Sequence, residues 1–177
     1  MKAKQRLLSL LLAVCLIVGL LPITAVAADT GANKAIVPGT DHLTGGQADN
    51  IYFGTYQQSS DGNGGFNIDP IKWRVLSNAD GKLFLLADQN LDVQKYHRIS
   101  RDTTWEQCTL RTWMNETFYN TAFSQNEQTY IAETTNENTD NKTQDKVFAL
   151  SHTEANDSAY FPDGNDSRKG TNTAYAG

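Results

Sequence analysis

Cysteine, histidine and proline are scarce in this chain of 177 residues. The only two cysteines are Cys15 and Cys108. If the N-terminal segment that carries Cys15 is removed, no intramolecular disulfide is possible, and the fold has to be stable through packing alone. The three histidines lie far apart, and the chain has no His-x-x-x-His or Cys-x-x-Cys pattern. We therefore expect no metal site and no cofactor.

Long apolar runs are missing after the first thirty residues, but one lies near the start. Three basic residues precede the apolar run 7–21, and small residues follow it up to Ala27 and Ala28. This order predicts a signal peptide over residues 1–28, cleaved near Ala27 or Ala28, and hence a secreted or cell-surface protein. The run is shorter than the roughly 20 residues that a membrane-spanning helix needs, so we expect no transmembrane segment after cleavage. An uncleaved anchor and lipid attachment at Cys15 are the alternatives.

Positive charge is in short supply as well. Removing residues 1–28 takes away three of the 15 Lys and Arg residues and none of the 20 Asp and Glu residues, which leaves a formal net charge of −8. An acidic chain of this kind argues against nucleic acid as a partner. The remaining length suits one domain, over residues 50–177, behind a flexible Gly-, Thr- and Asp-rich leader at 29–49.

Four segments rich in β-branched, aromatic and other apolar residues predict β-strands near 50–57, 70–78, 82–88 and 145–150. Asp80-Gly81 between the second and third segments is a strong hairpin signal. The segment Leu83–Ala87 is apolar throughout, so we expect it to be buried on both faces and central in an antiparallel sheet.

Three short helices are predicted, near 109–120, 124–131 and 152–159. Thr109 is a suitable N-cap for the first helix. One face of that helix is apolar, and we expect it to lie on the sheet that carries Trp73 and Phe84; its residues are Leu110, Trp113, Met114 and Phe118.

Ser-x-x-Glu sequences, typical of capping boxes, begin the second and third helices at Ser124 and Ser151. Residues 133–144 and the tail after Pro162 contain few large apolar residues, and we expect loops there. Together the predicted elements indicate an α+β fold, a small antiparallel sheet packed by short helices.

Cys108 is the weak candidate for a catalytic nucleophile. It lies just before a predicted helix, where the helix dipole favours a thiolate, but neither His97 nor His152 has a spacing that ties it to Cys108 as a base. The alternative is that Cys108 is a small buried residue beside Trp105, since free cysteines are often buried.

Aromatic residues are the other candidates for a site. A platform for stacking sugars could be drawn from Tyr52, Tyr56, Tyr96, Trp105, Trp113 and Tyr119. Of these, Trp105, Tyr96 and Tyr56 are the candidate ligand-binding residues. The alternative is that these rings pack in the core.

Several motifs, taken in order, carry a resemblance to a known family. They begin with Tyr52-Phe53-Gly54-Thr55-Tyr56-Gln57-Gln58 and Pro70-Ile71-Lys72-Trp73-Arg74-Val75-Leu76, continue through residues 104–115 and 118–123, and end with residues 145–151 and Thr173-Ala174-Tyr175-Ala176. This series resembles the domain-of-unknown-function family 6273.

The resemblance implies an exported or cell-surface protein of Gram-positive bacteria, with no established biochemical role. It also implies that the domain continues into Trp-Leu-Arg-Ser and Gly-Val-Arg-Pro-Ala motifs that this sequence does not contain, so we expect its C-terminal half to be missing. The family pattern is similar to formylglycine-generating and C-type-lectin-like α+β folds, an analogy of fold alone. The oxidase chemistry of the former needs a cysteine pair, which Cys108 alone cannot supply.

These observations predict an exported, non-catalytic module that binds glycans or cell-surface polymers. A secreted enzyme whose active site is completed by a missing C-terminal half is one alternative. A structural spacer of a surface protein is the other.

Overall fold

The computed structural model describes the backbone of residues 15–19, 51–136 and 142–177, and the side chains of all of these except 15–19. The predicted leader at 29–49 and most of the predicted signal peptide lie outside these ranges. Within them the chain forms an α+β fold, as the sequence predicts. Likeness to C-type lectins stays a prediction.

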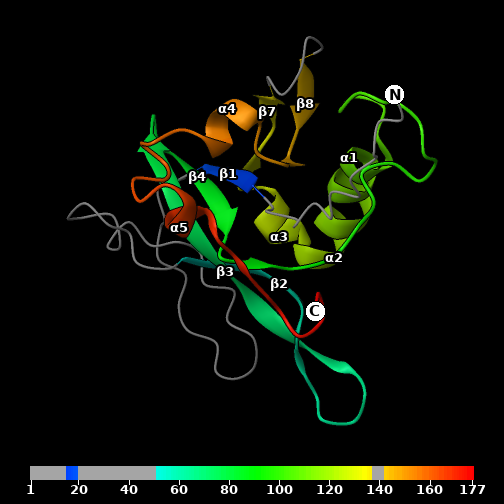
Figure 1. The fold of residues 1–177 in the computed structure, drawn as a ribbon. Helices are drawn as coiled ribbons and strands as arrows, with labels where there is room; N and C mark the ends of the chain where they lie inside the picture. The colour runs from blue at the N-terminus through cyan, green and yellow to red at the C-terminus, as the bar shows by residue number, and fades with distance from the viewer. Residues whose placement is uncertain (1–14, 20–50, 137–141) are drawn as a thin grey trace.

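An antiparallel sheet lies at the centre of the fold (Figure 1). Its strands run in the order β2-β3-β4-β1-β6, and β9 also pairs with β1. The bounds are β1 Cys15–Gly19, β2 Ile51–Ser60, β3 Phe66–Ala79, β4 Lys82–Ala87, β6 Ile131–Ala132 and β9 Val147–Phe148. The unexpected member is β1, because it lies within the predicted signal peptide.

The hairpin between β3 and β4 confirms the sequence-based turn. Asp80 and Gly81 both have positive φ values, 53° and 69°. Two consecutive positive values suit the right-handed twist of the flanking strands. β4 is buried from Leu83 to Ala87 and pairs with β3 on one edge and β1 on the other, so it is the central strand that its composition predicts.

The first predicted helix is present but irregular. It is formed by α1 (Thr109–Trp113), a π-helical turn η2 (Met114–Phe118) and α2 (Tyr119–Ala122). The expected N-cap at Thr109 is wrong by one residue. The cap is Cys108, whose Sγ accepts a hydrogen bond from the Arg111 amide at 3.4 Å, while the Thr109 hydroxyl instead accepts one from the Arg98 amide at 2.9 Å.

The two predicted capping boxes are confirmed. Ser124 caps α3 (Gln125–Gln128) and Ser151 caps α4 (His152–Ala155), each with its glutamate three residues on. Both helices are shorter than predicted, with only one turn each.

The tail after Pro162 is more ordered than we expected from its polar composition. It contains helix α5 (Asn165–Arg168) and strand β10 (Thr171–Asn172), which pairs in parallel with β5 (Gln89–Asn90). The expected loop at 133–144 also contains regular pairing, between β7 (Thr134–Asn136) and β8 (Thr143–Asp145).

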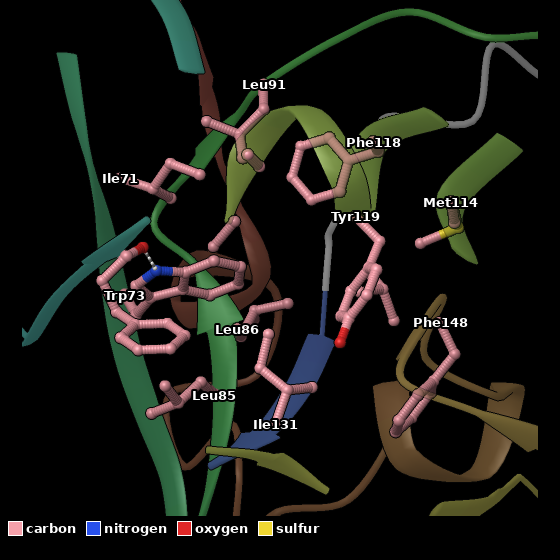
Figure 2. Packing of buried hydrophobic residues seen from close by; sticks show 14 of the residues in the cluster. Ile71, Trp73, Leu85, Leu86, Leu91, Met114, Phe118, Tyr119, Ile131 and Phe148 are labelled. Carbon is pink, nitrogen blue, oxygen red and sulfur yellow. Dashed lines mark hydrogen bonds between the residues drawn. The ribbon is translucent and has the colours of Figure 1, made fainter. Parts of the chain in front are cut away.

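The core lies on both faces of the sheet. On one face Trp73 contacts Phe123, and its Nε1 donates to the Phe53 carbonyl oxygen at 2.7 Å (Figure 2). Phe84 belongs to the same sheet but does not share the face of Trp73. Strand alternation turns Phe84 to the other side, where it contacts Phe148 and Tyr160.

Candidate functional site

A polar groove of about 450 Å³ lies where β2 and β3 approach the C-terminal segment. Its lining is mostly amides and hydroxyls with one aromatic ring: Tyr52, Gln58, Ser59, Ser60, Asp69, Pro70, Lys72, Gln89, Asn172, Thr173 and Ala174. The groove is open to solvent, and we take it as the candidate binding site because convergent polar groups in a concavity are typical of ligand sites.

Tyr52 and Lys72 lie at one end of the groove. They are cross-strand partners in the β2–β3 pair, so their side chains lie on the same face. Tyr52 is 39% exposed, between the buried Ile51 and Phe53. The Lys72 ammonium is held by the Asp88 carboxylate at 3.1 Å, which balances its charge.

Gln58 and Asp69 stiffen the middle of the groove. The Gln58 amide nitrogen donates to the main-chain oxygens of Asp69 and Pro70, at 2.7 and 3.1 Å. The Asp69 carboxylate accepts from the Ser59 hydroxyl and amide, at 2.6 and 2.9 Å. These hydrogen bonds to Ser59 lower the pKa of Asp69, so this side chain is ionised at neutral pH.

The opposite wall comes from the pairing of β5 with β10. The Gln89 amide nitrogen donates to the Thr171 hydroxyl at 3.2 Å, and the Asn90 amide nitrogen donates to the Asn172 side-chain oxygen at 2.8 Å. The Thr173 amide donates to the Asn90 carbonyl oxygen at 3.1 Å. Side-chain amides are therefore held at fixed positions on this wall.

The chemistry of the groove suits a neutral, hydroxyl-rich ligand. Amides and hydroxyls both donate and accept hydrogen bonds, and Tyr52 offers an apolar ring with a polar tip. The lining contains one ammonium, on Lys72, and one carboxylate, on Asp69, and the ammonium also pairs with the Asp88 carboxylate. The groove therefore has no large excess of charge that would select an ionic ligand.

The three candidate aromatics from the sequence lie elsewhere in the structure. Tyr56 is buried, and its hydroxyl donates to Asp92 at 2.7 Å; Trp105 is 3% exposed, and its Nε1 donates to Asp145 at 2.9 Å. Tyr96 is half-buried beside Cys108. These rings are not brought together as one exposed platform, and none of them lines the groove.

Cys108 is also buried, with 1% of its surface exposed. Burial raises the pKa of the thiol, and this effect outweighs the hydrogen bonds from the Arg111 amide and Tyr96 that lower it. The group is thus a thiol at neutral pH, and its Sγ serves as a helix cap.

Asp145 is the centre of a buried polar cluster. Its carboxylate accepts from the Arg111 Nε at 2.6 Å, the Trp105 Nε1 at 2.9 Å and the Thr143 hydroxyl at 2.6 Å. These donors satisfy the carboxylate and join α1 to the β7–β8 hairpin, so the cluster has a structural role. No group of three or more potential metal ligands was found within the described residues, and none of their helices is long and apolar enough to cross a membrane.

A family model matches residues 80–176, more than half of the chain, and its description is a domain of unknown function (DUF6273). The chain belongs to the DUF6273 family. The match begins at the turn between β3 and β4, so strands β2 and β3 lie entirely outside it. It includes β5 and β10, so the DUF6273 region forms one wall of the groove, and β2 and β3 form the other. Comparisons with curated proteins and with solved structures gave no match.

Most groove residues were not foreseen from the sequence. Tyr52 is one of the aromatic residues of the sugar-stacking hypothesis, and the alternation Ile51-Tyr52-Phe53 is the signal that directs it outward. Gln89 and Asn172 gave no such signal, because their positions depend on two-residue strands that pair across 82 residues of chain.

Proposed function

We propose that this protein is an exported, non-catalytic module that binds a glycan or a similar neutral polymer of the cell surface in the groove beside Tyr52. The observation that carries the proposal is the lining of the groove. Side-chain amides and hydroxyls on two walls face a half-exposed tyrosine ring, and sugars offer hydroxyls at their edges and apolar C–H faces to rings of this kind.

The openness of the groove favours a polymer over a small enclosed ligand. A chain of sugars needs a site that it can enter and leave along its length, and this groove is bounded by strands on two sides. The exposed Ser59 and Ser60 extend the polar surface beyond the ring of Tyr52.

A role in binding is favoured over the alternative of an enzyme that uses Cys108. The thiol is buried and protonated, and it caps α1 rather than facing the groove. The Asp69 carboxylate at the groove accepts two hydrogen bonds from Ser59, which lower its pKa and make it a poor general acid at neutral pH.

Export is part of the proposal and follows from the N-terminal sequence. The basic start, the apolar run and the small residues before Ala28 support cleavage and release to the cell surface or beyond. N-terminal sequencing of the protein from culture medium and cell wall tests this part, because a start near Asp29 is expected and a start at Met1 would contradict it.

The binding test compares two aromatic substitutions in the full chain. Tyr52 and Phe66 have nearly equal exposure, 39% and 38%, but only Tyr52 lines the groove. Loss of one ring contact costs about 1 kcal/mol, which is roughly a fivefold rise in Kd. We expect Tyr52→Ala to lose about that much affinity for insoluble cell-wall polysaccharide and Phe66→Ala to retain it.

Circular dichroism of both variants provides the control for folding. Failure of the unsubstituted chain to sediment with any cell-wall polymer, or to bind on a glycan array, would refute the proposed function. Equal weakening in both variants would refute the position of the site.

A further inference from the structure

β1 is an interior strand of the sheet, because a strand lies against each of its two edges. On one edge β1 pairs antiparallel with β4 along its whole length, from Cys15 opposite Leu86 to Gly19 opposite Lys82. On the other edge its first residues pair with β9 and its later residues with β6, both antiparallel. Figure 1 shows β1 in blue beside β4.

The sequence of β4 requires a neighbour at this edge. Leu83 and Leu85 are fully buried, and Phe84 and Leu86, which point to the opposite face, are 7% and 2% exposed. A strand buried on both faces is an interior strand, and an unpaired edge on it would leave main-chain N–H and C=O groups without partners. β3 occupies only one edge of β4.

The strands on the far side need the same neighbour. β6 and β9 have two residues each, and within the described part of the chain their sheet pairings are to β1 alone. Strands of this length are not stable by themselves. The segment in the place of β1 therefore connects β6 and β9, with the buried Ile131 and Val147, to the rest of the sheet.

Residues 15–19 lie within the predicted signal peptide, so cleavage near Ala28 would remove this strand and leave its place empty. We propose that the place of β1 is a strand-binding site, which in the cleaved protein takes up an extended apolar peptide segment supplied from outside residues 29–177. The inference rests on the predicted cleavage and is independent of glycan binding.

The geometry defines the chemistry of the segment. It runs antiparallel to β4, has about five residues, and lacks proline, because proline cannot donate a main-chain hydrogen bond. Its side chains are apolar, as in Cys-Leu-Ile-Val-Gly, because the residues opposite them are Leu83, Phe84, Leu85 and Leu86.

Two other occupants fit less well. A lipid chain offers no N–H or C=O groups for either edge. A second copy of the protein could pair its own β4 with this β4, but β6 and β9 would then remain unpaired. Only a single inserted strand can form main-chain hydrogen bonds both with β4 on one side and with β6 and β9 on the other.

The test uses the full chain, made by cell-free synthesis so that residues 1–28 are retained, with a protease recognition sequence inserted after Ala28. The folded chain is cut and mixed with a labelled peptide of residues 13–21 that carries Cys15→Ser. A matched peptide carries Ile17→Pro in addition, because Ile17 pairs with both Phe84 and Ala132. Hydrogen exchange of residues 83–87 reports occupation of the site.

We expect the first peptide to displace the cut fragment and to bind with a Kd at least tenfold lower than that of the proline peptide. Its binding should also restore slow hydrogen exchange at residues 83–87. If cutting unfolds the chain, we expect the first peptide alone to restore the fold. Three results would overturn the proposal: equal binding of the two peptides, a cut chain that neither peptide restores, or a dimer that excludes both.

Discussion

The pairing of Arg111 with Asp145 provides the sharpest test of what stabilises the fold. The Arg111 Nε and an Asp145 carboxylate oxygen are 2.6 Å apart, and the side chain of Asp145 is completely buried. Arg111→Met keeps an unbranched side chain of similar length and removes the cation, together with its hydrogen bonds to the Glu106 and Gln144 carbonyl oxygens. The substitution leaves a buried carboxylate without its charged partner, which is much more costly than the loss of the attraction itself.

The structure sets the magnitude of this loss. Removing one partner of a buried pair typically costs about 3–5 kcal/mol. Asp145 still accepts from Trp105 and Thr143, so we expect the lower end, about 3 kcal/mol. With the usual urea dependence of a small domain, the unfolding midpoint then falls by roughly 1–3 M.

The matched control is Lys169→Met. Lys169 and Asp166 are also 2.6 Å apart, but their side chains are 73% and 81% exposed. Water replaces the partner there, so we expect no measurable shift in the midpoint. Urea unfolding followed by tryptophan fluorescence measures both variants. Equal shifts in the two would refute the reasoning that burial, not distance, determines the contribution of the pair.

Three further results are expected. Gly54→Ala lowers the urea midpoint more than Gly81→Ala. Both glycines have positive φ, but a Cβ at Gly54 would lie 2.6 Å from the Phe123 ring, whereas a Cβ at Gly81 would have nothing within 4 Å. Equal shifts would contradict the close packing at Gly54. Native Cys108 is alkylated slowly by iodoacetamide and rapidly in denaturant, as followed by peptide mass spectrometry, because burial raises its pKa above the ordinary 9.0; rapid native labelling would reopen the nucleophile hypothesis. Burial, with a smaller effect of Cys108, raises the pKa of Tyr96 from 10.0 to about 12. Between pH 10 and about 12 the folded state therefore keeps a proton that the unfolded state releases, and the stability of the fold decreases as the pH rises through this range. Tyr96→Phe should make this fall in the urea midpoint less steep, and an unchanged pH profile would contradict the assignment.

The parts of the fold that were predictable have local causes. The β3–β4 turn follows from Asp80-Gly81 alone, and the starts of α3 and α4 follow from a serine and a glutamate three residues apart. The central place of β4 follows from its unbroken apolar composition.

The parts that failed depend on partners distant in sequence. Thr109 and Cys108 are adjacent and both able to cap a helix, and the choice between them is made by the Arg98 amide, which engages the Thr109 hydroxyl. Trp105 is buried, and its ring nitrogen has a hydrogen-bond acceptor there only because Asp145, 40 residues later, lies beside it. No pattern around Trp105 contains that information.

The candidate site is likewise predictable where its cause is local and unpredictable where it depends on distant residues. Strand alternation predicts that Tyr52 faces outward, but a groove needs a second wall, and the residues of that wall lie in a tail whose composition indicates a loop. A two-residue parallel pair such as β5 with β10 is too short for any periodicity to reveal it.

The pairing of β10 with β5 also affects the order in which the protein folds. The two strands are 82 residues apart in sequence, and pairings that close such long loops form slowly. During synthesis β5 leaves the ribosome well before β10 exists, so the groove cannot assemble while its first half is being made. If the protein is exported as proposed, the late pairing of β10 with β5 helps to keep the nascent chain unfolded until it has passed through the export channel.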